Sequence, residues 1–157
     1  MARWGSTDFQ QLKRLQKKME KLQSGDFEKF CEEAAKELAA RLLGKVIRRT
    51  PVDDGVLRRG WTVQTESQAQ GGGSPKNVQT YAESLIVTKV GNAYEIEVIN
   101  PVNYASYVEF GHRTANHAGW VNGRFMLTIS EQELDAQAPK ILEKKLMKFL
   151  GGVFDGN

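Results

Sequence analysis

The sequence predicts an α+β protein with a long N-terminal core helix, an antiparallel β-meander of three to four strands and a C-terminal amphipathic helix. Apolar residues recur at helical spacing over about residues 26–49 and again towards the C-terminus. Between these stretches, apolar and polar residues alternate with the period of a strand, around a Gly-Asn pair that is typical of a tight hairpin turn. The chain has 157 residues, which is enough for one domain with a core.

The charge and the cysteine content exclude several classes of protein. The net charge is only +3, whereas a protein that grips nucleic acid usually carries a larger and more concentrated excess. Cys31 is the only cysteine, so no disulfide can form within the chain, and we expect a buried thiol in a reducing compartment. No apolar run approaches the roughly 18 residues of a membrane span, so we expect no membrane partner.

Residues 1–25 are predicted to form a basic amphipathic helix. Its apolar positions alternate in spacings of three and four, as in a short coiled-coil seam: Leu12, Leu15, Met19 and Leu22. Two heptads are too few to hold a free coiled coil, so the seam must dock on the domain or on another subunit. The basic side chains could contact DNA phosphates, although a solvated face is the commoner use of such a run: Lys13, Arg14, Lys17, Lys18 and Lys21.

Residues 26–157 are predicted to form a single domain that begins with the main core helix, from about Asp26 to Arg49. Its apolar stripe comprises Phe27, Phe30, Cys31, Ala34, Ala35, Leu38, Leu42, Val46 and Ile47. Glutamates crowd its first half and arginines its last turn, which matches the helix dipole. Thr50-Pro51 ends the helix, because the residue before a proline is pushed out of the helical region.

The middle of the chain predicts a turn-rich connector at 51–60, followed by strands at 61–67, 82–90 and 93–100. The last two strands are joined by the turn Gly91-Asn92. Residues 68–79 have almost nothing to bury and predict a flexible loop, which we expect to become ordered on a neighbouring subunit. Its glycine-rich part is a candidate subunit contact: Gly71, Gly72, Gly73 and Ser74.

Residues 104–114 place several aromatic side chains around one carboxylate, Glu109. We expect a short helix that breaks at a glycine, with Tyr104, Tyr107 and Val108 anchoring the core. Glu109 is expected to cap a backbone turn or to pair with an arginine such as Arg113. The edge predicted to meet a neighbouring subunit consists of Phe110, Gly111, His112 and Arg113.

The C-terminal part predicts an edge strand or extended segment at 120–129 and then a helix. Ser130 and Glu133 have the spacing of a capping box, and the apolar stripe that follows ends at Gly151-Gly152. Pro139 lies inside this stretch. It predicts either a kink or the start of a second helical piece.

The residues that could support catalysis do not form a recognised arrangement. His112 and His117 lie five apart without a third ligand at a known spacing, whereas a zinc site needs three or four. Gly71–Ser74 lacks the lysine of a phosphate-binding loop, and no paired-carboxylate or nucleophile signature is present. We therefore expect no catalytic residues, no metal and no cofactor. A metal-dependent hydrolase using Glu109, His112 and His117 is the weaker alternative.

Two segments together resemble the bacteriophage tail-component family, the small neck or tail-completion proteins of long-tailed phages. The first, Arg49–Val63, reads Arg-Thr-Pro-Val-Asp-Asp-Gly-Val-Leu-Arg-Arg-Gly-Trp-Thr-Val and follows a long helix, as in the family. The second is Tyr-Ala-Ser-Tyr-Val-Glu-Phe-Gly-His at 104–112 with Gly-Arg-Phe-Met-Leu at 123–127 downstream. The order, the spacing and the hairpin between them agree, so the likeness covers about residues 26–150.

The resemblance implies a structural virion protein rather than an enzyme. It would form a homo-oligomeric ring, a hexamer or a dodecamer, at the head–tail junction, assembled in the cytoplasm of the host bacterium. Its partners would be the head-connector proteins and the tail-tube or terminator proteins, with non-specific DNA contact in the lumen. The alternative from another class is a small nucleic-acid-binding module that uses the basic N-terminal helix.

Overall fold

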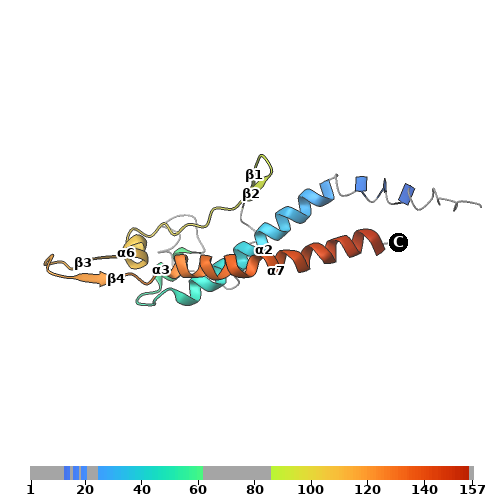
Figure 1. Ribbon diagram of the computed structural model, residues 1–157. Helices are drawn as coiled ribbons and strands as arrows, with labels where there is room; N and C mark the ends of the chain where they lie inside the picture. Colours follow the sequence, from blue (N-terminus) through green and yellow to red (C-terminus); the bar gives the residue numbers. More distant parts are fainter. Residues whose placement is uncertain (1–12, 15, 18, 21–24, 62–85, 156–157) are drawn as a thin grey trace, which may run out of the picture. The chain divides into compact units, whose positions relative to one another are not determined.

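The computed structural model describes residues 13–155, with gaps at 15, 18, 21–24 and 62–85 (Figure 1). The chain divides into two compact units, which are described separately below. One unit comprises residues 35–139, and the other comprises residues 1–34 and 140–157. Within the described ranges, no helix is both long and apolar enough to cross a membrane.

The described elements confirm the α+β class, because one long helix precedes the short strands in the chain and another follows them. Their bounds, in chain order, are α2 Gly25–Arg49, α3 Val56–Gly60, β1 Thr88–Val90, β2 Ala93–Glu95, α6 Ala105–Phe110, β3 Gly111–Arg113, β4 Trp120–Asn122 and α7 Met126–Asp155.

The four described strands form two separate antiparallel pairs, β1 with β2 and β3 with β4, where the sequence predicted one meander. Gly91-Asn92 does join β1 to β2, because Val90 pairs with Ala93 in the register. The predicted strand at 61–67 lies outside the described residues except for Trp61, which is buried directly after α3. The strands predicted at 82–90 and 93–100 shorten to three residues each in the described part.

The core of the unit at residues 35–139 gathers around the C-terminal half of α2. Leu43 and Val46 of this helix are fully buried. The remaining buried members come from α3, α6, the start of α7 and the segments between them: Leu57, Trp61, Val102, Ala105 and Met126. The short helices therefore have fixed positions on α2, and the site described below is built on them.

The end of α2 is tied to α3 by hydrogen bonds around a buried threonine. Thr50 donates from Oγ1 to the Val46 carbonyl at 2.7 Å, and its own carbonyl accepts Arg58 Nη2 at 3.0 Å. The connector then turns through Gly55, whose φ of 80° is in the left-handed region where a side chain is strained. Pro51 follows the end of α2, as the sequence predicted, whereas residues 56–60 of the predicted turn-rich connector form the short helix α3.

The other unit is organised around aromatic stacking. Phe30 stacks on Phe149 with ring centroids 4.6 Å apart, and Phe27 stacks on Phe30 at 6.2 Å. Such pairs stabilise helix contacts by about 0.5–1.5 kcal/mol beyond the buried area. These phenylalanines belong to the apolar stripes predicted for the two long helices.

Helix α7 begins four residues before the predicted capping box and runs through Pro139 to Asp155. Ser130 is fully buried inside the helix and donates to the Met126 carbonyl instead of capping. Glu133 points to α2, where its carboxylate accepts Lys45 Nζ at 3.0 Å and contacts the guanidinium of Arg49. The N–H groups at the N-terminus of α7 are instead capped by a residue that is distant in the chain.

Candidate subunit interface

Glu109 on α6 caps the N-terminus of α7. Its carboxylate accepts the backbone N–H of Leu127 on Oε2 at 2.9 Å and the N–H of Thr128 on Oε1 at 2.8 Å. The Thr128 hydroxyl donates to the same Oε1 at 2.7 Å. A buried carboxylate at this place satisfies N–H groups that have no helical partner and complements the helix dipole. Glu109 therefore has a structural role that fixes α6 against α7.

The base of the β3–β4 hairpin is locked between these two helices by close backbone approaches. Arg124 N donates to the Val108 carbonyl at 2.7 Å, and Phe125 N donates to the Glu109 carbonyl at 3.0 Å. A Cβ on Gly123 would lie 2.3 Å from the backbone carbonyl oxygen of Glu109. Gly111, with φ of 88°, approaches the Val121 carbonyl in the same way. No side chain fits at either glycine without a backbone shift, so the base of the hairpin is closely packed against the end of α6.

The tip of the hairpin is closed by a network of turn hydrogen bonds. Thr114 pairs with Gly119 through the backbone at 3.0 Å, and its Oγ1 accepts the Gly119 N–H at 3.0 Å. Asn116 accepts the Thr114 hydroxyl at 2.6 Å and the Ala118 N–H at 3.1 Å. His117 takes a positive φ of 57° at this turn. The tip is thus ordered although it lies in solvent.

Both faces of the hairpin are exposed. In the register His112 opposes Val121, and Arg113 opposes Trp120, so each pair shares one face. All four side chains are exposed. A two-stranded pair of this length cannot hold itself together in water. The hairpin depends on its anchored base and tip, and its apolar side chains Trp120 and Val121 remain 58% and 44% exposed.

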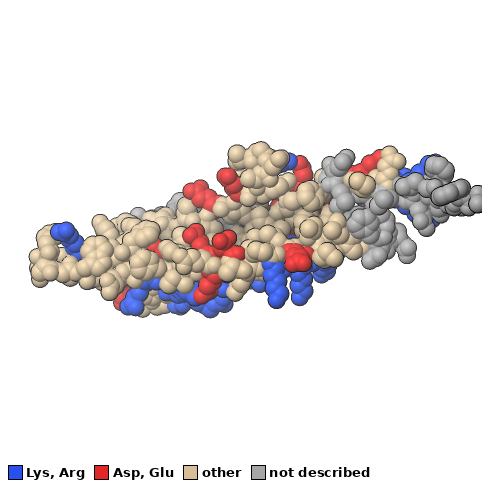
Figure 2. All heavy atoms as spheres, in the orientation of Figure 1, with Lys and Arg blue, Asp and Glu red and all other residues tan. Residues whose placement is uncertain are grey.

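Exposed apolar side chains gather on the hairpin and beside its base. We call this the aromatic surface, and its members are Tyr107, Phe110, Trp120, Val121 and Phe125, which are between 42% and 63% exposed. Tyr107 also lies 5.8 Å from the His112 ring, measured between centroids. In the space-filling view, the part formed by β3 and β4 is mostly uncharged, with a basic side chain and no acidic one on this face (Figure 2). Exposed apolar side chains grouped on one hairpin make it a candidate interaction surface.

The structure places the predicted edge on this surface. Phe110 ends α6 with 63% of its surface exposed, and His112 and Arg113 are exposed on β3. Gly111 lies buried beneath them. The expectation that Tyr104 and Tyr107 anchor the core is wrong, since they are 37% and 59% exposed. The buried face of α6 consists instead of Ala105 and Glu109, with Val108 packed against the core.

The other predicted contact residues lie far from this surface in the chain. Lys13, Arg14, Lys17 and Met19 are exposed in short helical stretches. Outside the described residues are Leu12, Leu15, Lys18, Lys21, Leu22, Gly71, Gly72, Gly73 and Ser74. Their roles stay predictions.

Trp120, Val121 and Phe125 are the surface residues that sequence reasoning missed. An alternating apolar pattern is normally assigned one buried face, and this hairpin has none. The available signal was the unusual charge distribution, because residues 110–130 contain two arginines, two histidines and no acidic residue. In the described part of the chain, no three His, Cys, Asp or Glu side chains converge as metal ligands.

The fold and this surface define a small α+β protein with an exposed aromatic hairpin. Residues 13–111 match the family model described as "Bacteriophage HK97-gp10, putative tail-component". The match spans more than half of the chain, and the chain belongs to this family. It is thus a tail component of a bacteriophage, a virion protein that interacts with other virion proteins. No curated protein and no solved structure shows significant similarity to the chain.

Proposed function

We propose that this tail component is a subunit of a homo-oligomeric ring at the head–tail junction, where it joins the portal-side connector to the tail. The observation that carries the proposal is the aromatic surface, whose side chains are largely exposed on and beside an ordered hairpin. A protein that stayed a monomer would have to leave Trp120, Phe110 and Tyr107 in water.

A ring needs two different surfaces on each subunit, because head-to-tail contacts close only when one patch meets another. The hairpin and the adjoining edge at Phe110, His112 and Arg113 supply one of them. The loop at 71–74 and the N-terminal seam at 12–22 are proposed as further contacts, with residues 26–157 acting as one domain. A contact made by an ordered hairpin also costs little conformational entropy on binding.

Sedimentation velocity over a concentration series tests the proposal. We expect the wild-type chain to sediment as an oligomer, and we expect Trp120→Ala with Phe110→Ala to shift it towards the monomer. The matched control is Met147→Ala, which removes a side chain that is also 64% exposed but belongs to the other compact unit. A monomer at all concentrations, together with no ring in assembled particles, would contradict the proposal.

Non-specific DNA contact in the ring lumen is the second candidate role. Lys13, Arg14 and Lys17 lie exposed and helical in the described part of the N-terminal segment. Basic side chains at such spacing contact backbone phosphates without reading sequence. Changing all three to glutamine should weaken binding to duplex DNA and flatten its salt dependence. An unchanged salt slope would remove this role.

A further inference from the structure

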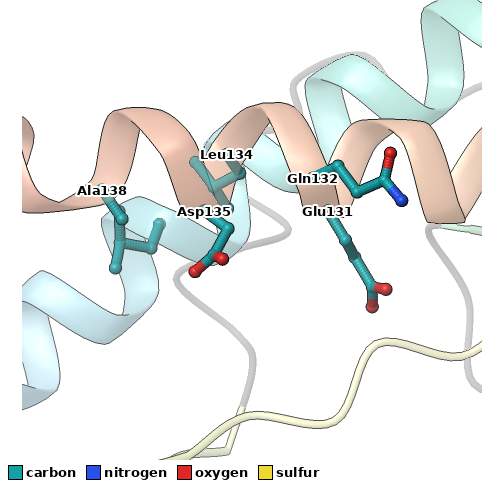
Figure 3. Close-up of a pocket in the computed structure, with 6 residues that line it drawn as sticks. Glu131, Gln132, Leu134, Asp135 and Ala138 are labelled. Atoms are coloured by element: carbon teal, nitrogen blue, oxygen red, sulfur yellow. The ribbon is translucent and has the colours of Figure 1, made fainter.

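A shallow groove on α7 carries charge opposite to that of the hairpin. It has a volume of about 460 Å³ and is lined by Leu38 of α2 and by Glu131, Gln132, Leu134, Asp135 and Ala138 of α7. We call it the acidic groove. Its lining includes the apolar side chains of Leu38, Leu134 and Ala138, which we call its apolar floor, and the carboxylates of Glu131 and Asp135 extend on one side of the α7 ribbon (Figure 3).

The two carboxylates of the acidic groove lack a cation within the described part of the chain. Residues 131–139 contain three acidic side chains and no basic one. Glu133 is already held by Lys45 and Arg49, which leaves Glu131 and Asp135. These two stand at i and i+4 on the helix, where like charges repel each other at close range. A cation brought from outside would relieve this repulsion.

The β3–β4 hairpin carries positive charge and an aromatic side chain, which are complementary to the acidic groove. Arg113 stands directly opposite Trp120 on one face, so a guanidinium and an indole are offered together. Neither Arg113 nor Arg124 has an ion pair among the described residues, and the stretch from 110 to 130 has no acidic residue to oppose them. An indole suits the apolar floor of Leu38, Leu134 and Ala138, and a guanidinium suits carboxylates at its rim.

We propose that the hairpin of one subunit docks in the acidic groove of the next, with Trp120 on the apolar floor and Arg113 between Glu131 and Asp135. The occupant is a second copy of this chain, and the inference rests on the self-association proposed above. Hairpin and groove are different patches, so the contact is head-to-tail and propagates from subunit to subunit.

A mixing experiment tests this arrangement. Trp120→Ala removes the hairpin anchor and keeps the groove, whereas Glu131→Arg with Asp135→Arg reverses the groove and keeps the hairpin. Each variant alone should associate at least about tenfold more weakly than the wild type, because juxtaposed like charges or a lost anchor disfavour the contact. Mixed in equal amounts, the two should form a heterodimer and nothing larger, since one intact hairpin meets one intact groove.

Two controls keep the outcomes distinct. Glu143→Arg makes the same charge change at another exposed acid of α7 and should assemble like the wild type. Circular dichroism and thermal melting of each variant establish that it is folded. If the wild type assembles and the groove variant assembles equally well, the docking mode is overturned and the ring stands. If the wild type is a monomer throughout, the ring and the docking mode fall together.

A photo-crosslink locates the contact independently. A benzoylphenylalanine at position 120 of the full chain, mixed with isotope-labelled copies, should crosslink between subunits to the peptide holding residues 131–138. Crosslinks to a second acidic pocket, formed by Pro51, Asp53, Asp54 and Tyr104, would contradict the assignment.

Discussion

Replacing Glu109 with glutamine should destabilise the protein strongly, although the two side chains have almost the same shape. The Glu109 carboxylate is 6% exposed and accepts three hydrogen bonds at the start of α7. A glutamine carbonyl can still accept from Thr128, but its amide would face the Leu127 N–H with another donor. That N–H would be buried without a partner.

The cost can be worked out from these contacts. A buried unpaired donor costs about 1–3 kcal/mol. Loss of a negative charge at a helix N-terminus costs about 0.3–1 kcal/mol, and up to about 2 where the site is partly buried. We expect the free energy of unfolding to fall by about 3 kcal/mol for Glu109→Gln. Thr128→Val, which removes only the hydroxyl bond, should cost about 1 kcal/mol.

Urea denaturation followed by circular dichroism measures both values, at a protein concentration where the oligomeric state is constant. With a slope of about 1–3 kcal/mol per molar urea, the Glu109→Gln midpoint should fall by about 1–3 M. The control is Glu143→Gln at an exposed position of the same helix. If Glu109→Gln lies within about 0.5 kcal/mol of this control, the cap does not hold α7 in the way described.

Three further outcomes are expected. Gly123→Ala should lower the free energy of unfolding by about 3 kcal/mol in the same urea assay, because its Cβ would meet backbone atoms. Gly44→Ala, in the middle of α2 where a Cβ meets no other atom, should instead raise it by about 0.5–1 kcal/mol. Equal effects of the two substitutions would contradict the close approach at Gly123. The hydrogen bond from Lys45, followed by the charge of Arg49, lowers the pKa of Glu133, so its stabilisation is present above pH of about 4.3 and is lost as pH falls through the lowered pKa. Urea midpoints of wild type and Glu133→Gln should therefore differ at neutral pH and converge in acid, and a constant difference would refute this. Burial and then the carboxylates of Asp54 and Asp53 raise the pKa of Tyr104. Asp54→Asn should therefore move the Tyr104 pKa back towards about 10, measured by ultraviolet titration with Tyr104→Phe as the reference. An unchanged Tyr104 pKa would exclude the Asp54 carboxylate as a cause.

The sequence predicted the elements whose signals are local. The apolar stripe of α2, the turn Gly91-Asn92 and the short helix ending before Gly111 each depend on residues within a few positions of one another. Among the described residues the strands form two separate pairs, with β3–β4 as a hairpin of its own, because strand pairing is not a local property.

The start of α7 shows why local reasoning fails at helix ends. Ser130 and Glu133 have the spacing of a capping box, yet Ser130 is inside the helix and Glu133 binds Lys45 and Arg49 of α2. The cap comes from Glu109, 18 residues before Leu127 in the chain. Glu109 was expected to cap a turn or pair with an arginine, and only the fold decides which N–H groups it reaches.

The candidate site was predicted in part for the same reason. Phe110, His112 and Arg113 flank the helix break at Gly111, and all three are exposed, as predicted for an edge that meets a partner. Trp120 could not be assigned to them from spacing, because the register of β3 with β4 brings it beside Arg113. The acidic groove combines Leu38 with residues near the start of α7, and its two sides are separated by most of the chain.

The central claim is that this tail component forms a ring at the head–tail junction. Electron cryomicroscopy of intact virions, with the chain tagged at its C-terminus and labelled by an antibody fragment, tests it most directly. For a ring at the junction, we expect label arranged symmetrically about the tail axis between head and tail. Label along the tail shaft or at its distal tip, with none at the junction, would contradict it.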